Sequence, residues 1–281
     1  MIYVLFNPKA NNSRGESDAK KWGEVLKEPA KYVSVIGLDF KHFFDSLKKE
    51  DEVILTGGDG TVNRFINDTY GFNFKNKLYY VKSGSGNDFY RDVLAKADKN
   101  GLVEFTQYIK KLPLITVNGI KRRFINGIGY GMDGECCRVG DEIRKNNPNA
   151  IINYKKIAIK LLLGKFKLRN STVEVDGKTY QYKNVWLSSA MFGHYYGSGM
   201  MAAPDKDRAK NDVCDVVTFS CHSRLLTLLR FPTFSAGKHK NKKYISHVVG
   251  KKIKVSFDIP CALQIDGDVV ENVSSYTVSF E

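Results

Sequence analysis

Cysteine is scarce in this chain of 281 residues, and long apolar runs are missing. The five cysteines form no CxxC pair and their odd number argues against a disulfide framework, so we expect a reducing, cytoplasmic compartment. No apolar run reaches the roughly 18 residues of a membrane-spanning helix. The first apolar run, residues 1–6, is too short for a signal peptide, and no basic segment precedes it. These absences together predict a soluble, globular protein.

Motifs of several enzyme classes are absent too. The histidines form no HxxxH or HExxH pattern and no Gly-x-Ser-x-Gly elbow is present, so zinc and acyl-transfer chemistry have no support. Residues 129–134 fit the pattern GxGxxG. This match lies in mid-chain, with neither an alternating β/α continuation nor an acidic residue about 20 positions later, which argues against dinucleotide binding.

Positive charge, by contrast, is abundant. Lysine and arginine number 44 against 30 aspartates and glutamates, a formal net charge of +14. Such a surplus favours contact with a polyanion, either nucleic acid or an anionic lipid surface, and the charge alone does not distinguish them. Residues 151–168 can form a helix with an apolar face and a lysine-rich face. That helix either docks on a membrane or packs on the rest of its domain.

The texture of the chain changes near residue 112. Before it, apolar strands alternate with amphipathic helices, which predicts a parallel sheet in an α/β domain over residues 1–111. After it, short β-rich runs follow one another, which predicts a mostly antiparallel, β-sandwich-like domain over residues 112–281. In the first domain we expect strands at 2–6, 32–36, 53–56 and 78–81, and helices at 17–26, 40–48 and 65–70.

A glycine-rich loop, Gly57-Gly58-Asp59-Gly60-Thr61-Val62-Asn63, directly follows the expected strand 53–56. Three glycines in four positions permit backbone conformations that side chains forbid, so consecutive amides can turn toward one anion. Asp59 would repel a phosphate unless it faces a cation or a hydroxyl proton, so the loop favours a Mg²⁺-nucleotide. The helix expected after the loop would point its positive end at the same phosphates. The loops at 7–8 and 83–86 also follow strands, and open α/β sheets bind ligands at that edge.

Several motifs, taken in order, resemble one enzyme family. The glycine-rich loop is followed by Gly-Ser-Gly-Asn-Asp-Phe at 84–89, by Met-Ala-Ala-Pro at 201–204 and by Asp-Gly-Asp at 266–268. In this order they resemble the diacylglycerol kinase and sphingosine kinase-like lipid kinases, most closely the soluble bacterial branch. The resemblance spans nearly the whole chain. It implies an ATP-binding α/β domain of the NAD kinase/diacylglycerol kinase type, a β-sandwich-like lipid domain, and phosphoryl transfer to a lipid hydroxyl.

The resemblance also implies roles for particular residues. The nucleotide contacts carried over are Asn7, Lys9, Gly57, Gly58, Asp59, Gly60, Thr61, Val62, Asn63 and Ser85. Amides suit phosphate oxygens, and a carboxylate such as Asp59 suits metal or charge organisation. Asp88 and Arg91 lie one helical turn apart, so they either orient the site as a pair or form an ordinary surface ion pair.

The base that takes the proton of the acceptor hydroxyl is placed by the resemblance in the Asp266-Gly267-Asp268 motif. Asp268 stands where the family has glutamate, one methylene longer, and Asp266 is the alternative base. Taken alone, Asp-Gly-Asp is also a good hairpin turn. The resemblance also implies a structural Mg²⁺ site, which an Asp-Asp-Gly run of the family helps to form. This chain lacks that run, and Asp212 and Asp215 are the residues that could still supply oxygen ligands.

Two other functions remain open from the sequence. An NAD kinase shares the glycine-rich loop but phosphorylates a soluble dinucleotide, and a nucleotide-sensing or nucleic-acid-binding regulator would explain the charge. No DNA- or RNA-binding motif is present, so no nucleic-acid partner is expected. The expected reaction is transfer from ATP to a membrane lipid, most simply diacylglycerol to phosphatidic acid. Lysines such as Lys155, Lys156 and Lys160 would hold the enzyme peripherally on an anionic membrane.

Overall fold

The computed structural model describes residues 1–26, 28–83, 87–147, 150–164, 166–210 and 212–280. The chain divides into two compact units, unit 1 with residues 1–111 and unit 2 with residues 112–281. All five cysteines are free thiols. Among the described residues, none of the helices combines the length and apolar character needed to cross a bilayer.

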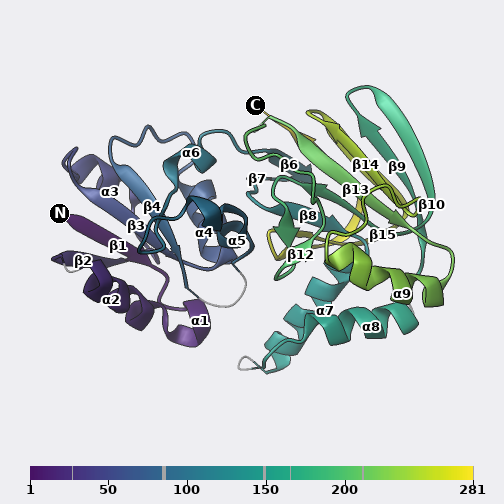
Figure 1. The fold of residues 1–281 in the computed structure, drawn as a ribbon, viewed down its shortest axis with the longest axis horizontal. Helices are drawn as coiled ribbons and strands as arrows, with labels where there is room; N and C mark the ends of the chain where they lie inside the picture. The colour runs from purple at the N-terminus through teal and green to yellow at the C-terminus, as the bar shows by residue number, and fades with distance from the viewer. Residues whose placement is uncertain (27, 84–86, 148–149, 165, 211, 281) are drawn as a thin grey trace. The chain divides into compact units, whose positions relative to one another are not determined.

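Unit 1 contains a sheet in the order β2-β1-β3-β4-β5 (Figure 1). Strands β1 to β4 run parallel, and the short β5 runs antiparallel to β4. The expected α/β class is therefore confirmed. The elements of unit 1 are β1 (Ile2–Phe6), α1 (Ala10–Ser13), α2 (Gly15–Leu26), β2 (Ala30–Ser34), α3 (Phe40–Ser46), β3 (Glu52–Gly57), α4 (Asp59–Asp68), β4 (Lys77–Lys82), α5 (Asp88–Val93), the 3₁₀ turn η1 (Leu94–Lys96), β5 (Val103–Glu104) and α6 (Thr106–Ile109).

Helices pack on both faces of this sheet. On one face, Ala19 of α2 joins Val4 of β1 and Ile54 of β3 in a buried apolar cluster. On the other face, the ring of Tyr3 meets the ring of Phe43 of α3 edge-on, with centroids 5.6 Å apart. Successive side chains of a strand point to opposite faces of the sheet. Because helices cover both faces, almost every side chain of β1 is packed against a helix, and β1 is therefore a nearly continuous apolar run.

Unit 2 is built on a large antiparallel sheet in the order β14-β13-β10-β8-β15-β16-β6-β7, with β9 paired to both β10 and β15 (Figure 1). This is the antiparallel, β-rich domain that the sequence predicts. The elements of unit 2 are β6 (Leu114–Val117), β7 (Ile120–Arg123), β8 (Gly127–Tyr130), α7 (Met132–Asn146), α8 (Tyr154–Leu163), β9 (Arg169–Val175), β10 (Lys178–Met191), β11 (Tyr195–Tyr196), β12 (Met200–Met201), β13 (Cys214–Ser220), α9 (Arg224–Ser235), β14 (Ile245–Gly250), β15 (Ile253–Ile265) and β16 (Asp268–Ser279).

Three helices, α7, α8 and α9, lie together beside the sheet of unit 2 (Figure 1). Ile157 and Leu162 of α8 are buried in a core with Trp186 of β10, so the sequence pattern at 151–168 reflects packing on the domain. Arg224 of α9 donates to the Leu162 carbonyl at 2.6 Å and thereby satisfies a carbonyl at the end of α8. Neither α7 nor α9 is expected from the sequence, because α7 begins inside a glycine-rich run and α9 contains Pro232.

Short turns of one kind close three hairpins of unit 2. Each consists of an Asn or Asp followed by Gly, both with positive φ, the arrangement that matches the twist of two paired strands. The three pairs are Asn118-Gly119 between β6 and β7, Asp176-Gly177 between β9 and β10, and Asp266-Gly267 between β15 and β16. The hairpin expected at Asp-Gly-Asp is therefore present.

Candidate active site

One edge of the unit 1 sheet gathers the loops that the sequence singles out. Strands β1, β3 and β4 are parallel neighbours, and their register places Phe6 beside Thr56 and Gly57 beside Lys82. The three following loops therefore leave the sheet at the same edge, where open α/β sheets bind ligands. The amide of Ser83 donates to the Gly57 carbonyl at 2.9 Å, which joins the loops after β3 and β4.

The glycines at the end of β3 serve close packing. None of Gly57, Gly58 and Gly60 has a positive φ, so the backbone conformations we expected from this motif are not adopted. A Cβ at Gly57 would lie 2.5 Å from the Cβ of Thr61, so a side chain there would separate β3 from α4. Gly58 has an extended conformation and caps α4. The chain thus passes from strand to helix with one residue between them.

Helix α4 begins at Asp59, six residues before the expected start at Phe65. The first turn of a helix carries amides without intrahelical partners, and together with the helix dipole these favour an anion. The side chains of Thr61, Val62 and Asn63 are buried. A ligand at this end of α4 would therefore meet backbone rather than these three side chains.

The Asp59 carboxylate accepts hydrogen bonds from two amides at the start of α5. Its Oδ2 lies 2.8 Å from the amide nitrogen of Asp88, and its Oδ1 lies 3.1 Å from that of Phe89. Asp59 therefore holds α5 against the start of α4. Burial, and secondarily the charge of Asp59, raises the pKa of Tyr80 well above its usual value. The phenol consequently stays protonated and donates to the Gly57 carbonyl at 2.9 Å.

Asp18 is a second anchor at this edge, and the sequence reasoning missed it. Its Oδ2 accepts from the Ser83 hydroxyl at 2.6 Å and from the Asn11 side-chain amide at 2.8 Å. Burial alone would raise the pKa of Asp18, but these hydrogen bonds outweigh it and lower the pKa. Asp18 ties the segment after β1 to the end of β4. In the sequence it looks like an ordinary acidic residue near a helix N-terminus.

The loop after β1 places Asn7 and Lys9 at the same edge. The Asn7 side chain accepts from the Lys9 amide at 3.0 Å, and the Asn7 carbonyl accepts from the Ala10 amide at 2.9 Å. A Cβ at Gly15 would lie only 1.9 Å from the Asn7 carbonyl oxygen, so glycine is required for this close approach. Lys9 is exposed. Ser85, the other expected contact, lies outside the described residues.

Asp88 and Arg91 form an ion pair on α5. The Arg91 guanidinium lies 3.5 Å from the Asp88 carboxylate, which is almost fully buried, while the arginine side chain is 43% exposed. The backbone amide of Asp88 is one of the two held by Asp59. This pair thus belongs to the same end of α5 as the Asp59 anchor.

In unit 2, Asp266 holds a neighbouring loop by three backbone hydrogen bonds. Its Oδ2 accepts from the Ile125 amide at 2.8 Å, and its Oδ1 accepts from the amides of Asn126 and Gly127, both at 2.9 Å. The Asp266 amide donates in return to the Gly127 carbonyl at 3.1 Å. Both carboxylate oxygens are therefore engaged in holding the start of β8 against the β15–β16 turn.

Asp268 has a different environment only two residues later. Its side chain is 64% exposed, and one oxygen lies 2.9 Å from the guanidinium of Arg122 on β7. An exposed carboxylate held by one arginine can meet a substrate hydroxyl without breaking the fold. Of the two aspartates of the motif, Asp266 is thus occupied by backbone hydrogen bonds and Asp268 is accessible to solvent.

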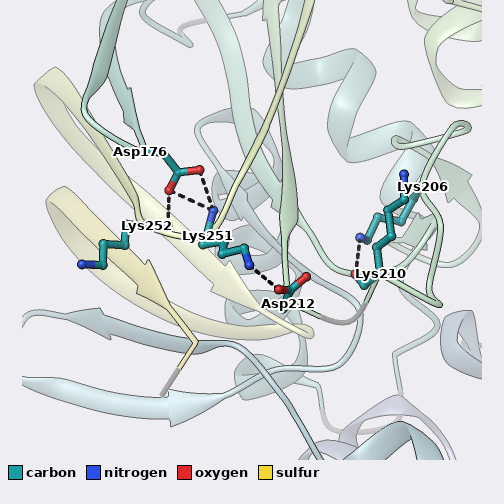
Figure 2. A network of polar contacts seen from close by, with 6 residues as sticks. All are labelled: Asp176, Lys206, Lys210, Asp212, Lys251 and Lys252. Carbon is teal, nitrogen blue, oxygen red and sulfur yellow. Dashed lines mark hydrogen bonds and ion pairs between the residues drawn. The ribbon is translucent and has the colours of Figure 1, made fainter.

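Asp212 and Asp215 do not come together as a metal site. The Asp212 carboxylate pairs with the Lys251 ammonium (Figure 2), and the Asp215 carboxylate faces the Lys206 ammonium at 3.8 Å. In the part of the chain that the structure describes, no three His, Cys, Asp or Glu side chains gather in a manner suited to a metal ion. This segment does not fit the structural magnesium site implied by the family resemblance.

Comparison with known families gives two matches, which follow one another along the chain. Residues 1–117 match the diacylglycerol kinase catalytic domain, and residues 126–278 match the YegS C-terminal NAD kinase beta sandwich-like domain. The chain belongs to the diacylglycerol kinase-like family of lipid kinases. The two matched regions correspond closely to units 1 and 2.

Individual relatives agree with this family. A Bacillus subtilis protein named diacylglycerol kinase is 26% identical over 235 residues, which cover 79% of this chain and 73% of the relative. A crystal structure titled as a diacylglycerol kinase from Bacillus anthracis has a TM-score of 0.66 at 19% identity, covering 99% of this chain and 93% of that one. The structural likeness shows the shared fold across both units.

Proposed function

We propose that this lipid kinase transfers the γ-phosphoryl group of Mg²⁺-ATP to a lipid hydroxyl, with diacylglycerol as acceptor and phosphatidic acid as product. The observation that carries the proposal is the edge of unit 1, where side chains of Asp18 and Asp59 fix the loops after three neighbouring parallel strands. The family matches over both units and the name of the Bacillus subtilis relative support lipid as the acceptor.

On the donor side, catalysis of phosphoryl transfer depends on positioning and electrostatic stabilisation. We assign phosphate binding to the first turn of α4 and to the loop of Asn7 and Lys9, because both lie at the ligand edge and supply amides and positive charge. Asp59 acts as a positioning residue in this assignment, since its two oxygens hold the amides that begin α5. Mg²⁺ enters as part of the nucleotide substrate.

On the acceptor side, we assign the base to Asp268 and a positioning role to Asp266. The Asp266 oxygens already accept three amide hydrogen bonds, whereas Asp268 is mostly exposed. Arg122 orients the Asp268 carboxylate from β7. During transfer, the hydroxyl proton passes to Asp268 while the lipid oxygen bonds to the γ-phosphorus and ADP leaves.

The decisive experiment measures transfer of labelled phosphate from Mg²⁺-ATP to vesicles that contain diacylglycerol or a sphingoid base. We expect labelled phosphatidic acid, and no label on NAD when it is offered instead. Asp268→Asn should lower turnover by about 10² to 10⁴-fold while ATP binding survives. Asp205→Asn is the matched control, because Asp205 is also an exposed aspartate of unit 2 in an ion pair, with Lys240 at 2.9 Å.

Two results would contradict this proposal. Label on NAD but not on any lipid would make the chain a dinucleotide kinase, and retention of nucleic acid without any transfer would make it a regulator. If the Asp268→Asn enzyme has the same turnover as the Asp205→Asn control, Asp268 is not the base and another residue takes the proton. Asp268→Glu then measures how much the reach of the side chain matters.

We also propose peripheral contact between helices α8 and α9 and an anionic membrane. Although α8 packs on the core through Ile157 and Leu162, Leu163 remains 60% exposed, and Leu225 and Leu229 of α9 are 65% and 66% exposed. The exposed lysines at 155, 156 and 160 of α8 accompany these side chains. Apolar side chains beside lysines suit a surface of acidic headgroups over acyl chains.

Vesicle sedimentation tests this contact. Lys156→Gln together with Lys160→Gln should weaken binding to anionic vesicles by about 10-fold or more, from roughly 1 kcal/mol per lysine, with the effect shrinking as salt rises. Lys178→Gln with Lys183→Gln, two exposed lysines of β10, removes the same charge elsewhere and should cost less. Equal losses for the two pairs, or wild-type binding that ignores salt and lipid charge, would contradict the assigned surface.

A further inference from the structure

Lys206 places an ammonium group inside unit 2, where its side chain is only 1% exposed. The Nζ atom lies 3.1 Å from the carbonyl oxygen of Val213 and 3.4 Å from those of Asp207 and Lys210 (Figure 2 shows the contact with Lys210). The Asp215 carboxylate is 3.8 Å away. Four oxygens from one short segment thus surround a single positive charge.

This arrangement meets the requirements of a buried cation. An ammonium has three N–H donors and no acceptor, and a buried lysine is tolerated only where oxygens satisfy those donors. The ring of Phe192 lies 5.7 Å from Nζ and adds a favourable face. Burial raises the pKa of Asp215, and the charge of Lys206 opposes that rise.

The same oxygens are those that a divalent cation would use. Backbone carbonyls and an aspartate are ordinary ligands of Mg²⁺ and Ca²⁺. A divalent ion about 4 Å from Nζ would be repelled by roughly 8 kcal/mol at an effective dielectric constant near 20, so the ammonium and a metal cannot share the site. Asp212, the other candidate ligand, is paired with Lys251.

We propose that the Lys206 ammonium is a built-in cation that organises residues 205–210 and 212–215 in place of a structural divalent metal. The segment precedes and enters β13, and its carbonyls converge on Nζ because the Lys206 side chain reaches across the turn. Folding of unit 2 therefore needs no metal, and the only Mg²⁺ required by the enzyme is the ion that accompanies the nucleotide.

Thermal unfolding of the full chain without nucleotide tests this proposal. The wild type should show the same Tm in EDTA, in millimolar MgCl₂ and in millimolar CaCl₂, and elemental analysis should find no stoichiometric divalent metal. Lys206→Met keeps the apolar stem but removes the charge, and should lower Tm by on the order of 10 °C without rescue by metal. Lys206→Ala also opens space at the oxygens, so its Tm should rise with MgCl₂ or CaCl₂.

Lys240→Met is the matched control, because its ammonium pairs with Asp205 in the same segment but is 67% exposed. Its Tm should stay close to that of the wild type. A wild type that loses stability in EDTA, or that is purified with one equivalent of metal, would overturn the proposal. So would a Lys206→Met protein with the Tm of the Lys240→Met control. If both Lys206 variants fail to fold, the chelator series and metal content of the wild type decide the question.

Discussion

Each unit uses an aspartate beside a glycine to hold a distant segment of the chain, but in different settings. In unit 1, Asp59 reaches from the first turn of α4 to two amides at the start of α5, about 30 positions along the chain. In unit 2, Asp266 reaches from a hairpin turn to three consecutive amides 139 to 141 positions away. The first anchor joins two helices at a ligand edge, and the second joins two strands.

Both aspartates hold buried residues. Asp88 and Phe89, held by Asp59, are 4% and 0% exposed, and Ile125 and Asn126, held by Asp266, are 0% and 2% exposed. Losing either carboxylate therefore leaves amides without acceptors inside the fold, two for Asp59 and three for Asp266. Asp59 also lies at the edge where we expect the substrate, so its loss should be felt in catalysis as well as in stability. Aspartates that look alike in two glycine-rich motifs are therefore expected to fail in different ways.

The largest effect is expected for Asp59→Ala, which should lower lipid phosphorylation by about 10²-fold or more because α5 loses its anchor at the ligand edge. The protein should remain folded. Asp39→Ala is the matched control, because Asp39 caps α3 in the same unit by accepting the His42 amide at 3.0 Å. Steady-state kinetics and thermal unfolding of both variants provide the measurement. If the two variants have equal turnover, the Asp59 anchor does not serve catalysis.

Asp266→Ala should lower the free energy of unfolding by about 3 kcal/mol, since three buried amides lose a charged acceptor. Asp176→Ala isolates that contribution. Asp176 has nearly the same positive φ in another Asp-Gly hairpin, but it accepts the exposed amides of Lys251 and Lys252. Both alanines carry the same backbone strain, so urea unfolding should show the larger loss for Asp266 by about 2 kcal/mol. If the two variants lose equal free energy of unfolding, the effect of Asp266→Ala comes from strain in the turn and not from the lost hydrogen bonds.

Asp133 sharpens the comparison, because it is a buried carboxylate that accepts hydrogen bonds from two side chains. Burial, partly offset by hydrogen bonds from the hydroxyls of Tyr196 and Ser189, raises the pKa of Asp133 to about 6. An unfolded aspartate titrates near 4, so the native state keeps a proton that the unfolded chain releases. This carboxyl therefore makes stability fall as pH rises from about 4 to 6.

Asp133→Asn keeps an acceptor for both hydroxyls and removes the titration. Its free energy of unfolding should exceed that of the wild type by on the order of 2 kcal/mol at pH 8, and the two should converge near pH 4. Urea unfolding across that pH range measures the difference. Asp258→Asn, the same substitution at an exposed position, is the control. If the curve of Asp133→Asn runs parallel to that of the wild type, the pKa of the Asp133 carboxyl is not raised in the folded protein.

Local features of this protein could be predicted from the sequence. The apolar runs of β1, β3 and β4, their alternation with helices and the change of texture near residue 112 led to the α/β and antiparallel classes that the structure shows. The hairpin at Asp266-Gly267 was also predictable, because Asp and Gly adopt left-handed conformations at little cost. These features depend on residues within a few positions of one another, so the sequence determines them.

Tertiary structure decided which groups each aspartate contacts. The sequence suggested that Asp59 faces a metal and left Asp266 and Asp268 as rival bases, but the partners of these carboxylates come from segments far along the chain. The same holds for Asp18, whose partner Ser83 lies 65 positions away. Lys206 differs, because its oxygen partners lie within nine positions of it and only the fold buries its side chain. A hydrogen bond depends on which groups the folded chain brings within about 3 Å, and burial sets its importance. Neither these distances nor the burial can be predicted from the local sequence pattern.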